Sequence, residues 1–382
     1  MKIVTTNSYI SLMTYGISLT VIGPALKEVQ GEIVLTGSEL GLFTTFLSVG
    51  LIISVLAGGF FVDRYRVKSV GLLGQLLLTL GLFTFSVFGS FPVGLFAFFM
   101  VGFGGGLIEI VVNTIISGIY AERRTAALNL LHGFFGVGAL VGPILMGYLV
   151  ESGFGWRFGY QVIALVSVIV LILQLLTKYP EKVSSDKIDF SYFFKIMRNP
   201  YTLILGAMIL LYVGSEMGIN YWSVLYMETN LDIPKITASS FLTYFWLAMT
   251  FGRFITFMVA QKIGGKRLLL CLTLFSVLAF SVFIFSRSGA AAGGALLALG
   301  LAFSGIFPTV VALGTDRFPE TLGTITGFLM MFMGGGTLLF PWLIGAISDV
   351  SSLRTGMLSI LFFIGLLTIL TGTLGFKRIG RA

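Results

Sequence analysis

The sequence predicts an all-α membrane protein with twelve transmembrane helices in two six-helix halves, and three observations carry this prediction. Hydrophobic residues make up 56% of the 382 residues, charged residues make up 10%, and the mean hydropathy is +1.00. Soluble domains carry about 25% charged residues, so the surface of this chain suits lipid rather than water. The other two observations are a regular series of long apolar runs and an internal repeat.

The apolar runs predict the transmembrane helices one by one. A helix needs about 20 apolar residues to cross a bilayer. The longest polar stretch, residues 178–200, is predicted to be a cytoplasmic linker between an N-terminal half, residues 1–177, and a C-terminal half, residues 201–382. The predicted spans cover residues at about 7–26, 38–62, 69–89, 92–120, 125–150, 157–177, 201–227, 235–261, 267–286, 290–315, 321–348 and 353–376.

The internal repeat has an offset of 198 residues. Six spans in each half return the chain to the side of the membrane on which it began. The two halves are therefore expected to be parallel repeats related by an axis along the membrane normal. The offset aligns Lys68 with Lys266, Gly16 with Gly214, and Pro143–Gly147 with Pro341–Gly345.

The basic residues predict the orientation of the chain. The loops and termini on one side of the predicted spans carry 18 Lys and Arg residues, the loops on the other side carry 5, and Arg253 lies inside a span. Because Lys and Arg collect in cytoplasmic loops, both termini are predicted to be cytoplasmic, with the spans in the inner membrane. This placement accounts for the net charge of +8 without a nucleic-acid partner.

Two acidic residues lie near the middle of predicted spans, Glu109 in residues 92–120 and Glu216 in residues 201–227. A charge at that depth costs at least a few kcal/mol, and desolvation favours the neutral, protonated carboxyl group. Glu109 is therefore the leading candidate for a proton carrier, and Glu216 is a second candidate for the coupling site. The alternatives are structural hydrogen bonds from protonated carboxyl groups, or a Na⁺ site that both acids share.

Amide and aromatic side chains follow both acids closely. Asn113 comes four residues after Glu109, and three further candidates come four to six residues after Glu216. Amides bond to hydroxyl groups, and aromatic rings suit the apolar faces of a sugar. These residues predict a site for a neutral hydroxylated ring, although an interfacial aromatic belt is a rival explanation for the tryptophan. The three candidates are Asn220, Tyr221 and Trp222.

Three other residues within spans bear on the chemistry. His132, the one histidine, could relay protons, bond to a hydroxyl group or simply pack between helices. Arg253 is nine residues before Lys262, so snorkelling or helix packing is favoured over substrate binding. Cys271, the one cysteine, is predicted to be a buried thiol. With so few soft ligands we expect no metal site, and the absence of a GxxxxGK[ST] loop argues against ATP-driven transport.

The stretch Gly59–Lys68 carries four charged residues between the second and third predicted spans: Asp63, Arg64, Arg66 and Lys68. It resembles the corresponding loop motif of the major facilitator superfamily, without the glycine usually found between the two basic residues. The resemblance to that superfamily extends over the whole chain. It implies that these four residues act in gating through charge pairing and do not contact the substrate.

Within the superfamily, the chain is similar to the fucose permease branch of sugar/proton symporters. That branch has a glycine-rich fourth helix with an acid and an asparagine, here Gly104–Gly106, Glu109 and Asn113. The resemblance implies substrate contacts at Asn129 and Tyr212, with His132 at the place of a glutamine. It departs from the branch because Ser8–Thr20 contains no acid and because Glu216 is an additional one. Further matching segments are Leu128–Asn129, Tyr212–Gly214, Gly252–Phe254, Phe307–Thr309 and Gly334–Gly336.

These observations predict a monomeric secondary transporter, not an enzyme, that imports a neutral monosaccharide with H⁺ by alternating access and that needs no cofactor beyond the coupling ion. Its expected partners are a sugar and membrane lipid. Three alternatives stay open. They are a Na⁺-coupled sugar symporter, a proton-coupled exporter of drugs or amphiphiles, and a sensor or scaffold that does not transport.

Overall fold

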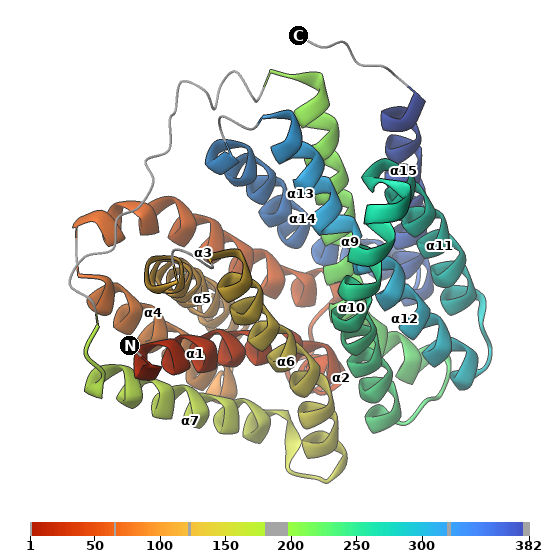
Figure 1. The fold of residues 1–382 in the computed structure, drawn as a ribbon. Helices are drawn as coiled ribbons and strands as arrows, with labels where there is room; N and C mark the ends of the chain where they lie inside the picture. Colours follow the sequence, from red (N-terminus) through yellow and green to blue (C-terminus); the bar gives the residue numbers. More distant parts are fainter. Residues whose placement is uncertain (1, 65, 121–123, 180–197, 319–321, 377–382) are drawn as a thin grey trace. The chain divides into compact units, whose positions relative to one another are not determined.

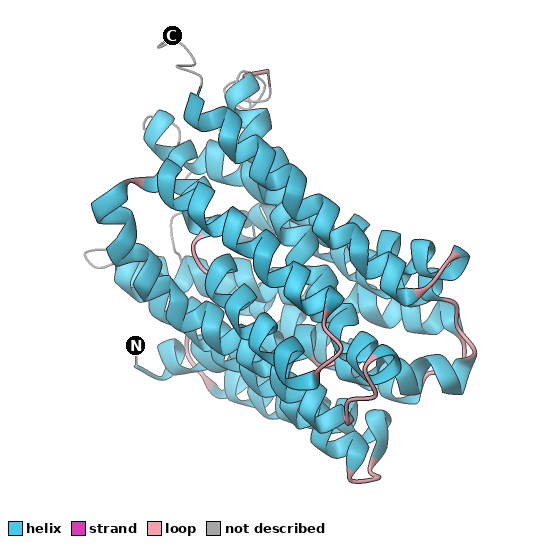
Figure 2. Ribbon diagram, turned by 90° about the vertical axis from the view of Figure 1, so that its right-hand side faces the viewer, coloured by secondary structure: helices cyan, strands magenta, loops and turns pink. Residues whose placement is uncertain are grey.

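The structure is a computed structural model that describes residues 2–64, 66–120, 124–179, 198–318 and 322–376. The side chains of residues 55–64, 124–126, 129, 257, 322–324 and 375–376 lie outside the description. Within the described ranges the chain consists of α-helices that short turns connect, and it contains no strand (Figure 2). The predicted all-α class is confirmed.

The chain divides into two compact units, and unit 1 comprises residues 1–185 together with residues 234–243. Its first six spans follow the predicted runs closely (Figure 1). The helices of unit 1 are α1 (Lys2–Thr20), α2 (Ile22–Ile33), α3 (Gly37–Arg64), α4 (Val67–Val87), α5 (Phe91–Ile119), α6 (Arg124–Glu151) and α7 (Gly155–Leu176).

Unit 2 comprises residues 186–233 and 244–382. The predicted linker, residues 178–200, lies for the most part outside the described residues, so the domain boundaries placed there stay a prediction. The remaining helices are α9 (Pro200–Asn230), α10 (Lys235–Ile263), α11 (Gly265–Phe285), α12 (Gly289–Phe303), α13 (Ile306–Arg317), α14 (Leu322–Val350) and α15 (Leu353–Phe376).

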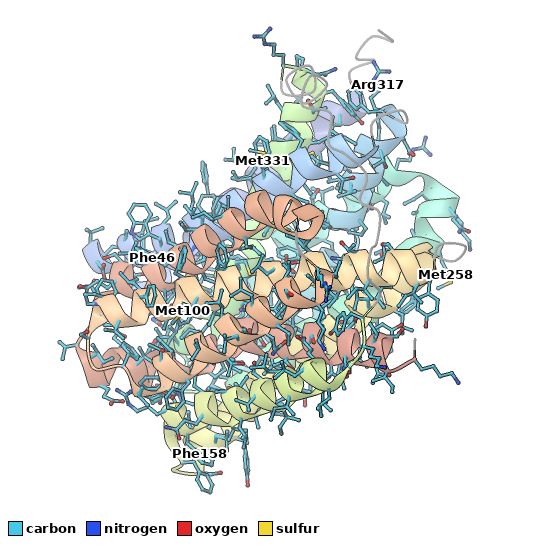
Figure 3. All side chains as sticks on the ribbon, turned by 90° about the vertical axis from the view of Figure 1, so that its left-hand side faces the viewer. Phe46, Met100, Phe158, Met258, Arg317 and Met331 are labelled. Carbon is cyan, nitrogen blue, oxygen red and sulfur yellow. The ribbon has the colours of Figure 1, made fainter. Side chains whose placement is uncertain are left out.

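Among the described residues, eleven helices are long and apolar enough to cross a membrane, and the pair α1 and α2 makes a twelfth span if the two are counted together. Large apolar side chains on these helices are exposed, among them Phe46 at 37% and Met331 at 52%, and Figure 3 shows Phe158, 41% exposed, at the margin of the molecule. A lipid surrounding satisfies such side chains, whereas water would not. The chain is therefore a multi-pass membrane protein, as predicted.

Two predicted spans are broken, and a proline explains each break. Helices α1 and α2 meet at a bend of 45°. Pro24, in the first turn of α2, has no N–H to donate to the carbonyl oxygen of Thr20 four residues earlier. Pro308 stands in the same relation to Ser304, where α12 ends before α13 begins. In each case the span continues beyond the break, and α12 and α13 together form the span Gly289–Arg317.

The predicted internal repeat is visible in matching contacts. The Nζ atom of Lys68 donates to the carbonyl oxygens of Leu175 and Thr177 at the end of α7, at 2.7 and 2.9 Å. The Nζ atom of Lys266, the equivalent lysine of the second half, donates to the carbonyl oxygen of Leu374 at the end of α15, at 3.1 Å. Each lysine therefore caps the last helix of its own half.

Close helix packing repeats with the same offset. A Cβ atom on Gly138 of α6 would collide with the backbone of Met13 in α1, and one on Gly336 of α14 would collide with the backbone of Leu210 in α9. Small residues at such points let membrane helices approach closely. The pairs α1–α6 and α9–α14 are thus equivalent parts of the two halves, which confirms the repeat.

A buried polar network joins α1, α4 and α7 in unit 1. The Gln174 amide donates to Ser11 Oγ at 2.8 Å and to Gln75 Oε1 at 3.3 Å, and the Gln75 amide donates to Ser167 Oγ at 2.7 Å. Hydrogen bonds of this kind hold membrane helices together where the hydrophobic effect cannot. The network fixes the helix that carries Tyr15 in place.

The first residues of α10 belong to unit 1 because they bond to α2 and α6. The Nζ atom of Lys235 donates to Glu28 Oε2 of α2 at 2.7 Å and to the carbonyl oxygen of Pro24 at 2.9 Å. The Glu151 carboxylate at the end of α6 accepts from the backbone N–H of Ile236 at 2.7 Å. A carboxylate at a helix N-terminus is favoured by the helix dipole, so both charges secure the start of α10.

Candidate functional site

Glu109 lies on α5, which runs from Phe91 to Ile119. At a rise of ~1.5 Å per residue it lies about 6 Å from the middle of the helix, toward the end that leads to α6. One turn earlier, Gly105 leaves room for the ring of Tyr15, which a Cβ atom there would strike. Tyr15 is 2% exposed and interacts electrostatically with Glu109.

The Glu109 carboxyl group forms no hydrogen bond or ion pair with the side chains that the structure describes. Tyr15 is the polar side chain packed beside it, and its ring also meets Phe135 of α6 edge-on, with centroids 6.1 Å apart. A carboxylate without a partner in an apolar surrounding is costly. The geometry therefore suits a group that is neutral for part of its working cycle.

Asn113 lies one turn beyond Glu109 on the same helix and is half-buried. Within the described part of the chain, its amide forms no hydrogen bond, so its donors and its acceptor are open to a ligand. His132 lies on α6, three residues before Phe135 and therefore on the face that adjoins Tyr15. The side chain of Asn129 lies outside the described residues. Unit 1 thus brings Glu109, Asn113 and the helix of His132 together.

Glu216 has a different environment in unit 2. It lies near the middle of α9, which runs from Pro200 to Asn230, and is 8% exposed. The Tyr212 hydroxyl, one turn earlier, hydrogen-bonds to the Glu216 carboxyl group, and the positive charge of Arg253 on α10 attracts it. The carboxylate of Glu216 is therefore partly compensated within its own unit.

The other predicted residues of α9 are engaged with neighbouring helices. The Trp246 indole N–H of α10 donates to Asn220 Oδ1 at 3.0 Å, and the Trp222 indole N–H donates to the carbonyl oxygen of Pro341 in α14 at 2.9 Å. Tyr221 is 1% exposed and packs edge-on against Trp222, with ring centroids 5.3 Å apart. Asn220 and Trp222 thus join α9 to α10 and α14, and Tyr221 packs against Trp222.

The gating motif is only partly within the described side chains. Asp63 and Arg64 end helix α3, but their side chains lie outside the description. Arg66 is exposed at the start of α4, and Lys68 bonds to the last carbonyl groups of α7. The predicted charge pairing of this motif stays a prediction.

Sequence reasoning missed two features of the structure, the place of Tyr15 and the exposure of Cys271. It gave Tyr15 no role, because a tyrosine in an apolar run carries no signal by itself. For Arg253, where snorkelling or helix packing was favoured over substrate binding, the structure shows an exposed side chain whose charge attracts the Glu216 carboxylate. Sequence reasoning predicted a buried Cys271, whereas the structure exposes that thiol on α11. Among the described residues, no group of three His, Cys, Asp or Glu side chains is placed to hold a metal ion.

Comparisons with known proteins agree with this architecture. The sequence model described as "Major Facilitator Superfamily" matches residues 8–341 and 204–379. The "Protein TsgA homolog" of Buchnera aphidicola subsp. Schizaphis graminum is 23% identical over 339 residues, which cover 87% of this chain and 86% of that protein.

Solved structures share the fold at low sequence identity. The nucleoside transporter NupG superposes with a TM-score of 0.83 at 14% identity and covers 98% of this chain and 99% of its own. The D-xylose-proton symporter gives 0.80 at 15% identity, covering 99% and 98%. The E. coli fucose:proton symporter FucP gives 0.62 at 17% identity, covering 97% and 98%.

Proposed function

The chain belongs to the Major Facilitator Superfamily, and from that premise we propose that it imports a neutral monosaccharide together with H⁺ by alternating access. One observation carries the proposal. Glu109 and Asn113 lie one turn apart on α5, and both lack hydrogen-bond partners among the described side chains. A group that can take a proton therefore stands beside a group that can bond to a hydroxyl.

The proposed cycle uses the cost of a buried charge. When the site faces the outside, water reaches Glu109 and the carboxyl group takes a proton. The neutral form can then move through an apolar surrounding, whereas the carboxylate would oppose that movement. On the inner side the carboxyl group is hydrated again and releases the proton together with the substrate. Glu109 thereby couples the proton gradient to accumulation.

The substrate class follows from the side chains in each unit. Asn113 on α5 offers a half-buried amide that can bond to a hydroxyl group. The carboxylate of Glu216 attracts the positive charge of Arg253, so the described spans offer little net positive charge to a phosphorylated or strongly anionic substrate. We therefore propose a neutral ring with several hydroxyl groups. The nucleoside, xylose and fucose transporters that share the fold carry compounds of that kind.

The orientation is part of the same proposal. Both termini lie in the cytoplasm and the spans lie in the inner membrane, because 18 basic residues gather on the side of the termini and 5 on the other. A fluorescent protein that matures only in the cytoplasm, fused after Ala382, should fluoresce in cells. A dark, full-length fusion would contradict this orientation.

A thermal-shift screen of the purified chain tests the function. Neutral monosaccharides and nucleosides should be added one at a time, at two pH values and with Na⁺ or choline as the cation. A ligand that binds the native state raises the melting temperature. We expect a neutral sugar to do so, more strongly at the lower pH and equally with both cations.

Matched variants make the screen decisive. Asn113→Ala should remove the shift caused by the sugar, whereas Thr114→Ala, on the neighbouring position of α5, should keep it. If the sugar raises the melting temperature only when Na⁺ is present, the coupling ion is Na⁺ rather than H⁺. Stabilisation by cationic amphiphiles alone, with no sugar active, would overturn the proposed substrate class and favour an exporter.

A further inference from the structure

A groove of about 410 Å³ runs along the outer surface of unit 2, between α10 and α11. Its walls are apolar, and several of the side chains that form them are exposed, with Ile255 at 51% and Phe275 at 42%. In a membrane-spanning helix pair such a surface lies against lipid. The residues that line the groove include Gly252, Ile255, Val259, Ile263, Cys271 and Phe275.

The length of the groove matches one leaflet of a bilayer. It extends along α10 from Gly252 to Ile263, eleven residues further on, which is about 16 Å at the rise of an α-helix. Half of the ~30 Å hydrocarbon core is about 15 Å. An extended acyl chain from a lipid of that leaflet therefore fits the groove along its whole length.

The end of the groove that meets the membrane surface is positively charged. Lys262 and Arg267 are exposed on either side of the turn that joins α10 to α11, next to the groove residues Ile263 and Leu268. The segment from Lys262 to Arg267 contains no acidic residue. A third cation, Lys266, is already engaged with the carbonyl oxygen of Leu374. Two cations are thus left at the mouth of the groove.

We propose that this groove binds one anionic phospholipid, with an acyl chain along α10 and α11 and its phosphate between Lys262 and Arg267. Basic residues at the membrane surface attract anionic headgroups. Each one favours an anionic over a zwitterionic lipid about fivefold. Two of them give a preference on the order of 30-fold over a zwitterionic lipid. The lipid would fill the groove between α10 and α11, which are joined by a turn at Gly264.

The exposed thiol of Cys271 gives a direct probe, because it is the one cysteine of the chain and lies in the groove about one turn from Arg267. A small fluorophore is attached to Cys271, and its fluorescence intensity is measured with the protein in phosphatidylcholine vesicles. A small, equal fraction of the lipid is then exchanged for dibrominated phosphatidylglycerol or dibrominated phosphatidylcholine. Bromine quenches only on close approach, so stronger quenching by phosphatidylglycerol reports selective occupancy of the groove.

The variant Lys262→Gln together with Arg267→Gln should abolish the headgroup preference. The control, Lys178→Gln together with Arg198→Gln, removes one exposed lysine and one exposed arginine elsewhere and should keep it. Equal quenching by both lipids in the unmodified sequence would overturn the proposal. So would a preference that inorganic phosphate removes, because the site would then bind free phosphate rather than a lipid.

A second measurement covers the case in which the label itself blocks the groove. The unlabelled protein in detergent should gain thermal stability from phosphatidylglycerol more than from phosphatidylcholine. The gain should be lost in the variant at Lys262 and Arg267 and kept in the control. Equal stabilisation of all three proteins would contradict the site, whatever the substrate of the transporter is.

Discussion

The acids Glu109 and Glu216, each within a membrane-spanning helix, differ in what surrounds them. Glu216 in unit 2 has the Tyr212 hydroxyl and the charge of Arg253 to compensate its carboxylate. Glu109 in unit 1 has Tyr15 beside it, which is acidic rather than basic, and no hydrogen bond or ion pair among the described side chains. A charge without compensation is the more costly of the two in an apolar surrounding. We therefore propose Glu109 as the acid whose protonation is coupled to movement.

The comparison also distinguishes the roles of the two units. The internal repeat places Phe307 at the position that corresponds to Glu109, so the repeat by itself does not require an acid. We propose that unit 1 carries the carboxyl group that binds the proton, and that the cluster of Tyr212, Glu216 and Arg253 in unit 2 takes part in recognition of a neutral ring. The predictions below test this division of labour, beginning with the largest expected effect.

Neutralising the two acids should affect transport in different ways. Glu109→Gln should abolish accumulation of substrate driven by a pH gradient, because no proton can be carried, while exchange of labelled for unlabelled substrate continues. Glu216→Gln should lower uptake but keep its dependence on the gradient. Uptake into proteoliposomes with an imposed pH difference measures both. Normal accumulation by Glu109→Gln would show that the proposed role is wrong.

The balance between Glu216 and Arg253 can be tested with a double-mutant cycle. Arg253→Gln should weaken substrate binding, because the carboxylate of Glu216 loses its compensating charge. The double variant with Glu216→Gln should recover part of the loss, with a coupling energy of about 0.5–3 kcal/mol. Titration calorimetry with the sugar found in the screen gives the four affinities. Strict additivity would mean that the two side chains do not interact.

The helix packing that positions the cluster of unit 1 predicts a stability effect. Gly138→Ala places a methyl group against the Met13 backbone and should cost about 1–3 kcal/mol. Gly336→Ala should cost a similar amount, because it is the equivalent position in unit 2. Gly133→Ala, on the same helix as Gly138 and with nothing within 4 Å of the added atom, should leave the melting temperature unchanged. An unaltered melting temperature for Gly138→Ala would contradict the close approach.

The smallest effect concerns the two capping lysines. Lys68→Gln and Lys266→Gln each remove a charge near a helix C-terminus, a contribution of about 0.3–1 kcal/mol. Lys68 should cost more, because it bonds to two carbonyl oxygens and Lys266 bonds to one. Thermal unfolding of the two variants side by side measures the difference. A larger loss for Lys266→Gln would reverse the expected order.

The sequence predicted the helices well because hydrophobic length is a local property. Runs such as 157–177 and 201–227 became α7 and α9 with ends shifted by a few residues. The repeat was also readable, since equivalent positions such as Lys68 and Lys266 keep the same residue. These features need no knowledge of which helices touch.

The surroundings of the acids were not readable, because they depend on contacts between helices. Nothing in the sequence places Tyr15 against Gly105, or Arg253 near Glu216. Exposure of Cys271 likewise depends on how α10 and α11 diverge. Periodicity also did not reveal the breaks at Pro24 and Pro308, although each proline lies four residues after the carbonyl group that it leaves without a donor.

Proton uptake on substrate binding tests the central claim most directly. Purified protein in weakly buffered detergent, with a pH indicator, receives the sugar found in the thermal screen. The account predicts that the unmodified protein and Glu216→Gln take up protons as the sugar binds. Glu109→Gln should bind the sugar without any proton uptake. Proton uptake by Glu109→Gln equal to that of the unmodified protein would contradict the account.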